Sequence, residues 1–111
     1  MAKFLVLYSS PVTYAEQMEM SSPEDMKAGM EAWMEWSREV GPALADFGLP
    51  LGESNRVSGG SASRGESDGR GYSIIEADSL DDATKLVEEH PHLHQPDGWI
   101  DVFEMMPAPG M

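Results

Sequence analysis

The three histidines of the chain lie together in one stretch, HPHLHQPDGW, residues 90–99. Histidines two apart on a regular strand project from one face and can ligate a metal ion together. Pro91 interrupts that regularity, and His90 falls near the end of an expected helix, where a protonated ring is favourable. Three interpretations stay open. The stretch could be a metal site that holds His90, His92 and His94, a turn with incidental histidines, or part of a cleft wall. In a cleft, His90 or His92 would serve as hydrogen-bond partner or base.

A carboxylate follows these histidines on the last expected strand, WIDVFEMM, residues 99–106. Along this strand Asp101 projects to one face and Glu104 to the other. If both faces are covered, one of the two is partly buried, and it is then either paired or has a raised pKa. A carboxylate with a raised pKa is a candidate for acid–base catalysis. We therefore predict Glu104 as a catalytic residue beside His90 and His92. A hydrogen-bonded carboxylate at an interface is the alternative.

Two tryptophans in the first long helix could bind a ligand. Trp33 lies on the apolar stripe of the helix, which favours core packing. Trp36 lies about 60° away around the helix, where an indole at the edge of a cleft can stack on a ligand. We predict Trp33, Trp36 and Tyr8 as ligand-binding residues. An irregular apolar guest would suit the nearby methionines, which are Met26, Met30 and Met34.

Three of the chain's four arginines cluster within residues 56–70, a stretch rich in glycine and serine. Arg56, Arg64 and Arg70 could close over an anionic ligand. The alternative is a solubilising hairpin loop. The chain holds no phosphate-binding loop of the G-x-x-x-x-G-K-[ST] type and no nucleophile elbow.

The overall charge narrows the range of partners. Twenty Asp and Glu stand against seven Lys and Arg, which gives a formal net charge of −13. This field repels phosphate backbones and anionic lipid surfaces, so we expect neither nucleic acid nor membrane as a partner. No apolar run is long enough to span a bilayer, and we expect a cytoplasmic protein.

Cysteine is absent. Disulfides, thiolate nucleophiles and sulfur-ligated zinc or iron–sulfur sites are thereby excluded. We expect neither a metal nor a cofactor. The 111 residues are expected to form one domain, residues 1–106, followed by a tail, residues 107–111.

The first half of the chain predicts one strand and one long helix. KFLVLY, residues 3–8, is apolar without alternation, which predicts a strand buried on both faces. A loop is expected over residues 9–22. Ser22 then caps a helix whose apolar stripe reaches residue 47, with a kink at Pro42 and an end at Gly48.

The second half predicts three strands and a helix. A weak strand is expected over residues 49–57, followed by a polar, mobile stretch, residues 58–70. GYSIIEA, residues 71–77, is a clear strand, and Ser79 caps a helix that ends near His90. With WIDVFEMM as the last strand, the order is βαββαβ.

That order predicts an α+β fold with a ferredoxin-like protomer: a four-stranded antiparallel sheet with two helices on one face. The other face would be bare, yet KFLVLY is apolar on both sides. A second copy packed against that face covers it most simply. We therefore predict a homodimer that forms through the sheet faces, a dimeric α+β barrel.

Several segments of the chain, in order, resemble the YCII-related proteins, and most closely their DGPF-domain subgroup. These segments are KFLVLY, AWMEW, GLPLGESNRVSGG, GYSIIEADSLDDATKLVEEHPHL and IDVFEMMP. The resemblance implies the dimeric α+β barrel. Some members carry a His/Asp pair suggested as an acid–base dyad, with the histidine early in the first helix. The corresponding stretch here, PEDMKAGMEAWMEW, has no histidine, so the dyad is not carried over.

These observations lead to two expectations of function. The first is a cofactor-free acid–base enzyme that acts on a small, largely apolar organic molecule in a cleft of each protomer. The second is a non-catalytic homodimer that binds a small ligand or serves as an accessory module. The sequence leaves open which of them applies.

Overall fold

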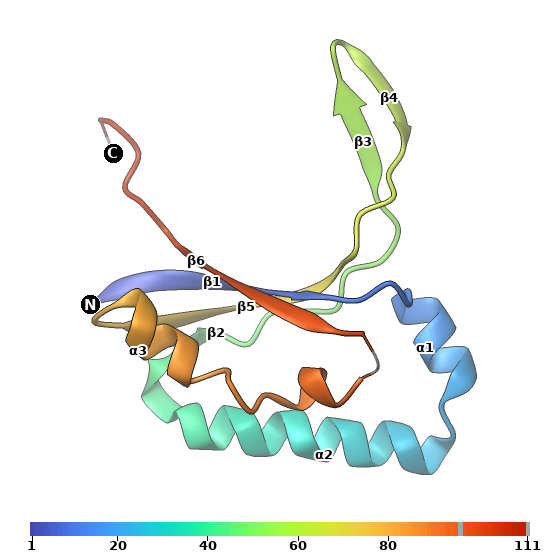
Figure 1. Ribbon diagram of the computed structural model, residues 1–111, viewed down its shortest axis with the longest axis horizontal. Coiled ribbons are helices and arrows are strands. Elements are labelled where there is room, and N and C mark those ends of the chain that lie inside the picture. The colour runs from blue at the N-terminus through green and yellow to red at the C-terminus, as the bar shows by residue number, and fades with distance from the viewer. Residues whose placement is uncertain (96, 111) are drawn as a thin grey trace.

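The computed structural model describes residues 1–95 and 97–110. These residues form an α+β fold around a four-stranded antiparallel sheet with the strand order β2-β5-β1-β6 (Figure 1). The strands are β1 (Ala2–Ser9), β2 (Leu44–Asp46), β5 (Gly69–Ala77) and β6 (Trp99–Glu104). Pro96 in the histidine stretch and Met111 in the predicted tail lie outside the described residues.

The central strand β1 is buried on one face in the single chain. Phe4, Val6 and Tyr8 are buried, whereas Leu5 and Leu7, which point the opposite way, are only half-buried. Since Leu5 pairs with both Ile74 and Phe103, the second face continues across the neighbouring strands. We call this second face the outer face; it carries Leu5, Leu7, Tyr72, Ile74, Trp99 and Phe103.

Two helices, α2 (Pro23–Val40) and α3 (Leu80–Lys85), pack on the other face of the sheet. The Ser22 and Ser79 side chains each accept a hydrogen bond from the third helical N–H, which confirms both predicted caps. The helices and the sheet share one core, which consists of Phe4, Val6, Tyr8, Trp36, Val40, Ile75, Ala77, Ala83 and Val87.

Residues 9–22, expected to be a loop, include a helix instead. This helix, α1 (Tyr14–Met20), is capped by Thr13, whose hydroxyl accepts a hydrogen bond from the N–H of Glu16. None of the seven described residues of α1 is buried. The loop prediction was wrong because α1 holds only one side of a cleft and so has no continuous apolar stripe.

The long helix ends earlier than predicted. It stops at Val40, and Gly41, at φ 61°, turns the chain into a 3₁₀ turn, Gly41–Ala43. Pro42 therefore lies in a new element, this 3₁₀ turn, instead of kinking the helix. Residues 44–46 form β2, the edge strand beside β5. The prediction of helix up to Gly48 was wrong because the apolar residues near the break also suit a strand.

Residues 49–70, expected to hold a weak strand and a mobile stretch, form an antiparallel hairpin. Its strands are β3 (Asn55–Ser58) and β4 (Ser61–Arg64), which pair only with each other. Gly59 and Gly60 join them at φ 57° and 84°, values that glycine adopts without strain. This two-glycine turn is the local cause of the hairpin.

The hairpin and the tail after β6 extend from the sheet on the side away from α2 (Figure 1). Val57 in the hairpin and Met106 in the tail are each 73% exposed. The radius of gyration of the Cα atoms is 15.5 Å, compared with about 13 Å for a compact chain of this length. The single chain is therefore more extended than its length requires.

Within residues 1–95 and 97–110, no helix is long and apolar enough to cross a membrane.

Candidate functional site

A cleft of about 590 Å³ opens beside the end of the sheet, between α1, the N-terminal half of α2 and the neighbouring ends of β1 and β5. It exists because only the C-terminal half of α2, with Trp36 and Val40, is buried against the sheet. The N-terminal half includes Gly29, which has no side chain, and Met30, whose side chain is flexible. These residues leave space above the sheet. A cleft of this size suits a small organic molecule.

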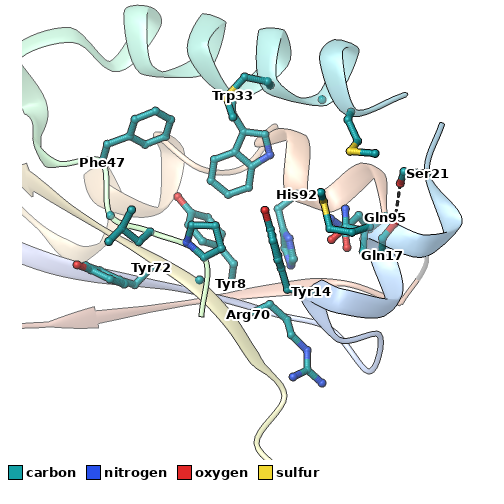
Figure 2. Close-up of a pocket in the computed structure, with 18 of the residues that line it drawn as sticks. Tyr8, Tyr14, Gln17, Ser21, Trp33, Phe47, Arg70, Tyr72, His92 and Gln95 are labelled. Atoms are coloured by element: carbon teal, nitrogen blue, oxygen red, sulfur yellow. Dashed lines mark hydrogen bonds between the residues drawn. The ribbon is translucent and has the colours of Figure 1, made fainter. Parts of the chain in front are cut away.

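Aromatic and apolar side chains form most of the cleft wall (Figure 2). The apolar side chains of the lining are Tyr8, Tyr14, Met18, Met26, Met30, Trp33, Phe47, Leu49 and Pro50. Trp33 contacts Tyr8 edge-on, with ring centroids 4.8 Å apart, and lies 6.2 Å from Phe47. Such a wall binds a guest mainly through buried apolar area and ring stacking.

Three of the six predicted site residues line this cleft: Tyr8, Trp33 and His92. They come from β1, α2 and the 3₁₀ turn Pro91–His94 respectively. The fold therefore brings together parts of the chain that are more than fifty residues apart.

The Tyr8 hydroxyl is held in a chain of hydrogen bonds. It donates to Ser73 Oγ over 2.8 Å, and Ser73 in turn donates to the carbonyl of Phe47 over 2.6 Å. Burial raises the pKa of Tyr8 well above its ordinary value of 10, although the bond to Ser73 acts in the opposite direction. Tyr8 is thus a fixed, neutral phenol that offers its ring to the cleft.

His92 is 2% exposed, and its Nε2–H donates to the carbonyl of Ser9 over 2.7 Å. Burial lowers the pKa of His92, whereas the carbonyls of Ser9 and Trp99 favour the protonated ring and offset part of the effect. A neutral imidazole therefore borders the cleft at neutral pH. Its Nε2 already ties the 3₁₀ turn to the end of β1, which limits its freedom to act as a base.

His90 lies in the core and not among the described residues that line the cleft. Its ring centroid is 4.7 Å from that of Tyr8 and 4.4 Å from those of Trp33 and Trp36. Nδ1 accepts the N–H of His92 over 2.9 Å, which places the proton of the neutral ring on Nε2. Within the described residues Nε2 has no hydrogen-bond partner. The Trp33 ring lies nearly perpendicular to the His90 ring.

Acid should destabilise the fold through His90. Burial, with smaller contributions from His92 and His94, lowers the pKa of His90 from 6.5 to about 3. A base with a depressed folded pKa stabilises the fold fully above its unfolded pKa, and that stability is lost as the pH falls from about 6.5 towards 3. The expected loss at pH 5 is about 2 kcal/mol from this group alone.

Urea unfolding at pH 7 and pH 5 tests this expectation. Asparagine can retain the hydrogen bond to His92 without titrating, so His90→Asn should lose less stability than the parent between these pH values. Comparison with the parent cancels every contribution that the two proteins share. His94→Asn, which changes an exposed histidine of the same turn, is the control and should lose nearly as much stability as the parent, because His94 is the smallest of the three causes that lower the pKa of His90. An identical pH dependence in His90→Asn and the parent would contradict the assignment.

Trp36 and Glu104 also lie outside the cleft lining. Trp36 is 5% exposed, and its Nε1 donates to the carbonyl of Leu86 over 2.8 Å, so it belongs to the core. Glu104 is exposed and pairs with Phe4, four residues from Tyr8 along β1. That spacing corresponds to roughly 13 Å. The structure thus does not bring Glu104 together with His92.

Several residues of the cleft, three of them polar, were not predicted from the sequence as site residues. Gln17, Ser21 and Gln95 lie at one end of it, and Phe47 lies at the other (Figure 2). A signal for one wall was present in the sequence. Tyr14, Gln17, Met18 and Ser21 are spaced i, i+3, i+4 and i+7, which is one face of a helix. The stripe is half polar, and therefore it does not resemble a core-facing helix.

The arginines of residues 56–70 do not converge on one point. Arg64 pairs with Glu53 over 3.1 Å, and Arg56 lies on β3 of the hairpin. Arg70 lines the cleft, but its Nε donates to the carbonyl of Ser10 over 2.9 Å. Within the described residues, no group of three His, Asp or Glu side chains is placed to hold a metal ion.

No protein-family model matches the chain, and no curated protein matches it either. The likeness to YCII-related proteins therefore stays a prediction from the sequence.

Proposed function

We propose that the protein binds a small, largely apolar organic molecule in the cleft between α1, α2 and the sheet. The observation that carries the proposal is the wall around Trp33, in which Tyr8, Tyr14 and Phe47 offer aromatic rings to one space. The described polar groups of the core wall are already paired: Tyr8 with Ser73, and His92 with Ser9. An arrangement that is mostly apolar and internally satisfied favours binding over catalysis.

A substitution at Trp33 tests the site. A thermal-shift screen of small aromatic compounds and metabolites identifies ligands, and titration calorimetry gives their affinities. Truncating an aromatic anchor typically costs at least 10-fold in affinity, so Trp33→Ala should weaken binding by about that factor or more. Met34→Ala, one residue further along α2 and outside the cleft lining, should bind like the parent. Equal affinities in Trp33→Ala and the parent would place the ligand elsewhere.

The second candidate is a cofactor-free acid–base enzyme that uses His92. The observation that favours it is the neutral imidazole at the cleft wall, which is the base form of the side chain. The screen also separates the two candidates. Each ligand is incubated with the protein and analysed by mass spectrometry. A changed mass, or isotope exchange from heavy water, would favour the enzyme, and a ligand returned unchanged would favour the binding protein.

We further propose a ferredoxin-like protomer in a homodimer, as expected for a YCII-related, DGPF-domain-like protein of the cytoplasm. The strand order β2-β5-β1-β6 with antiparallel neighbours supports the protomer fold. The half-buried leucines of the outer face support a sheet-to-sheet dimer. A lone two-stranded hairpin is marginal in water, so the extended β3–β4 hairpin also suggests a partner surface.

A charge on the outer face should separate the two subunits. Phe103 is 50% exposed in the single chain, so Phe103→Glu disturbs the protomer little but places a carboxylate in the proposed interface. Size exclusion with light scattering should give twice 12.2 kDa for the parent and 12.2 kDa for this variant. Met34→Glu, on the helical side, should stay dimeric. A parent of 12.2 kDa at micromolar concentration would contradict the dimer.

A further inference from the structure

Three polar side chains of the cleft gather at one end, and this distribution carries information about the ligand. Gln17, Ser21 and Gln95 lie together at the end away from Phe47 (Figure 2). The first turn of α2, which contains Asp25, follows Ser21 directly and also lines the cleft. A ligand that fills the cleft therefore has an apolar body against Trp33 and a polar group near α1 and the start of α2.

The two formally charged side chains among the described lining residues are Asp25 and Arg70, and they are differently available. Arg70 donates from Nε to the carbonyl of Ser10, and a terminal nitrogen lies 3.7 Å from the carboxylate of Asp68. In Figure 2 its guanidinium group points away from Trp33 and Tyr8. The cation is therefore engaged outside the centre of the cleft.

Asp25 is less engaged. Its Oδ2 accepts the N–H of Ser22 over 3.2 Å, and its Oδ1 accepts no hydrogen bond within the described residues. The Asp25 N–H is bound in turn by the Ser22 hydroxyl, so the capping box occupies the amide donors that an anion would need. The first turn of α2 thus offers an acceptor to the cleft and little donor capacity.

Two further features favour positive charge. The net charge of −13 raises the local concentration of cations and lowers that of anions around the protein. The rings of Tyr14 and Trp33 border the same space, and aromatic faces attract ammonium groups. The neutral amides of Gln17 and Gln95 accept hydrogen bonds from an ammonium as readily as from a hydroxyl.

We propose that the ligand is an organic amine: a ring system that packs on Trp33, with an ammonium group directed to Asp25 and the glutamine amides. This inference rests on the proposed binding function and adds the charge and the orientation of the guest. The cleft discriminates against carboxylates of the same shape.

Calorimetric titration of three compounds that share an indole ring tests the proposal: tryptamine, indole-3-ethanol and indole-3-acetate. At low salt tryptamine should bind about two- to fivefold tighter than the alcohol, the gain expected from one exposed ion pair, and the acetate should bind weakest. Added salt should weaken the binding of tryptamine alone.

Asp25→Asn should reduce the affinity for tryptamine to that of the alcohol and leave the alcohol unchanged. Asp82→Asn is the matched control, since Asp82 holds the same third position in α3 and lies outside the cleft lining. Should Asp25→Asn fold poorly, the order of the three affinities and their salt dependence still decide the matter in the parent protein.

Each result has a defined meaning. Equal affinity for the amine and the alcohol overturns the charge inference and leaves the apolar binding function standing. Tightest binding of the acetate overturns the inference and assigns the polar group to Arg70. If no member of the series binds at millimolar concentration, the charge inference fails together with binding of flat aromatic guests.

Discussion

Replacement of Gly48 by alanine is expected to destabilise the protein by about 3–5 kcal/mol, a large part of the stability of a domain of this size. Gly48 lies at φ 80°, and a Cβ placed on it would overlap the backbone carbonyl of Tyr72 in the central strand β5. Strand backbone cannot move aside without breaking the pairing with β1. The neighbouring Phe47 carbonyl also holds Ser73, so the shift would reach the hydrogen-bond chain of Tyr8.

Urea unfolding of matched variants measures this effect. Gly60 has a similar φ of 84°, but a Cβ there would meet nothing within 4 Å. Gly60→Ala therefore isolates the backbone strain and should cost at most about 1–2 kcal/mol. Gly48→Asn relieves the strain but keeps the Cβ, so it should remain severe, whereas Gly60→Asn should be nearly neutral. Similar losses at both positions would mean that the close approach to β5 is not decisive.

Trp36→Ala is the second substitution with a large expected effect on stability, again about 3–5 kcal/mol. Trp36 is 5% exposed, it packs against His90 at a centroid distance of 4.4 Å, and its indole N–H satisfies the Leu86 carbonyl. Truncation leaves a cavity beneath α2 and an unpaired carbonyl. Trp36→Phe refills most of the cavity and should cost about 1–3 kcal/mol, mainly through the lost hydrogen bond.

The contrast with Trp33, three residues earlier, makes the Trp36 prediction specific. Trp33 lines the cleft and Trp36 does not. Trp33 also packs against the core, so both alanine variants should lose stability, but ligand titration should distinguish them. Trp36→Ala loses stability and keeps its ligand affinity at temperatures where it is folded, whereas Trp33→Ala loses affinity. A loss of binding without a loss of stability in Trp36→Ala would contradict the assignment.

Much of the fold could be predicted because its signals are local. The apolar run in β1, the GYSIIEA strand and the caps Ser22 and Ser79 depend only on neighbouring residues, and the structure contains all four. The predicted kink at Pro42 lies at the observed break, but the end of the helix there could not be predicted, because the apolar residues beyond it suit a helix as well as the edge strand β2. A hairpin was one of the two interpretations of residues 56–70, and the structure contains it, but its two strands could not be located because they are too polar to show alternation.

The site was harder to predict, since it depends on where a turn directs each side chain. His90 and His92 are alike in sequence, yet the 3₁₀ turn at Pro91 directs one ring into the core and the other to the cleft wall. The positions of the two tryptophans relative to the core and the cleft also differ from the prediction. Trp33, expected mainly in the core, packs against the core and also lines the cleft, whereas Trp36, expected at the cleft edge, is buried and donates to the Leu86 carbonyl.

The helix α1 and its C-cap Ser21 contribute four side chains to the cleft, yet no residue of the helix is buried. The part of the wall that α1 and Ser21 supply is therefore separate from the core that holds the domain together. Substitutions at positions 14, 17, 18 and 21 can therefore change which ligands bind while changing the free energy of unfolding only slightly. A scaffold divided in this way is free to diversify in what it accepts while its architecture stays the same.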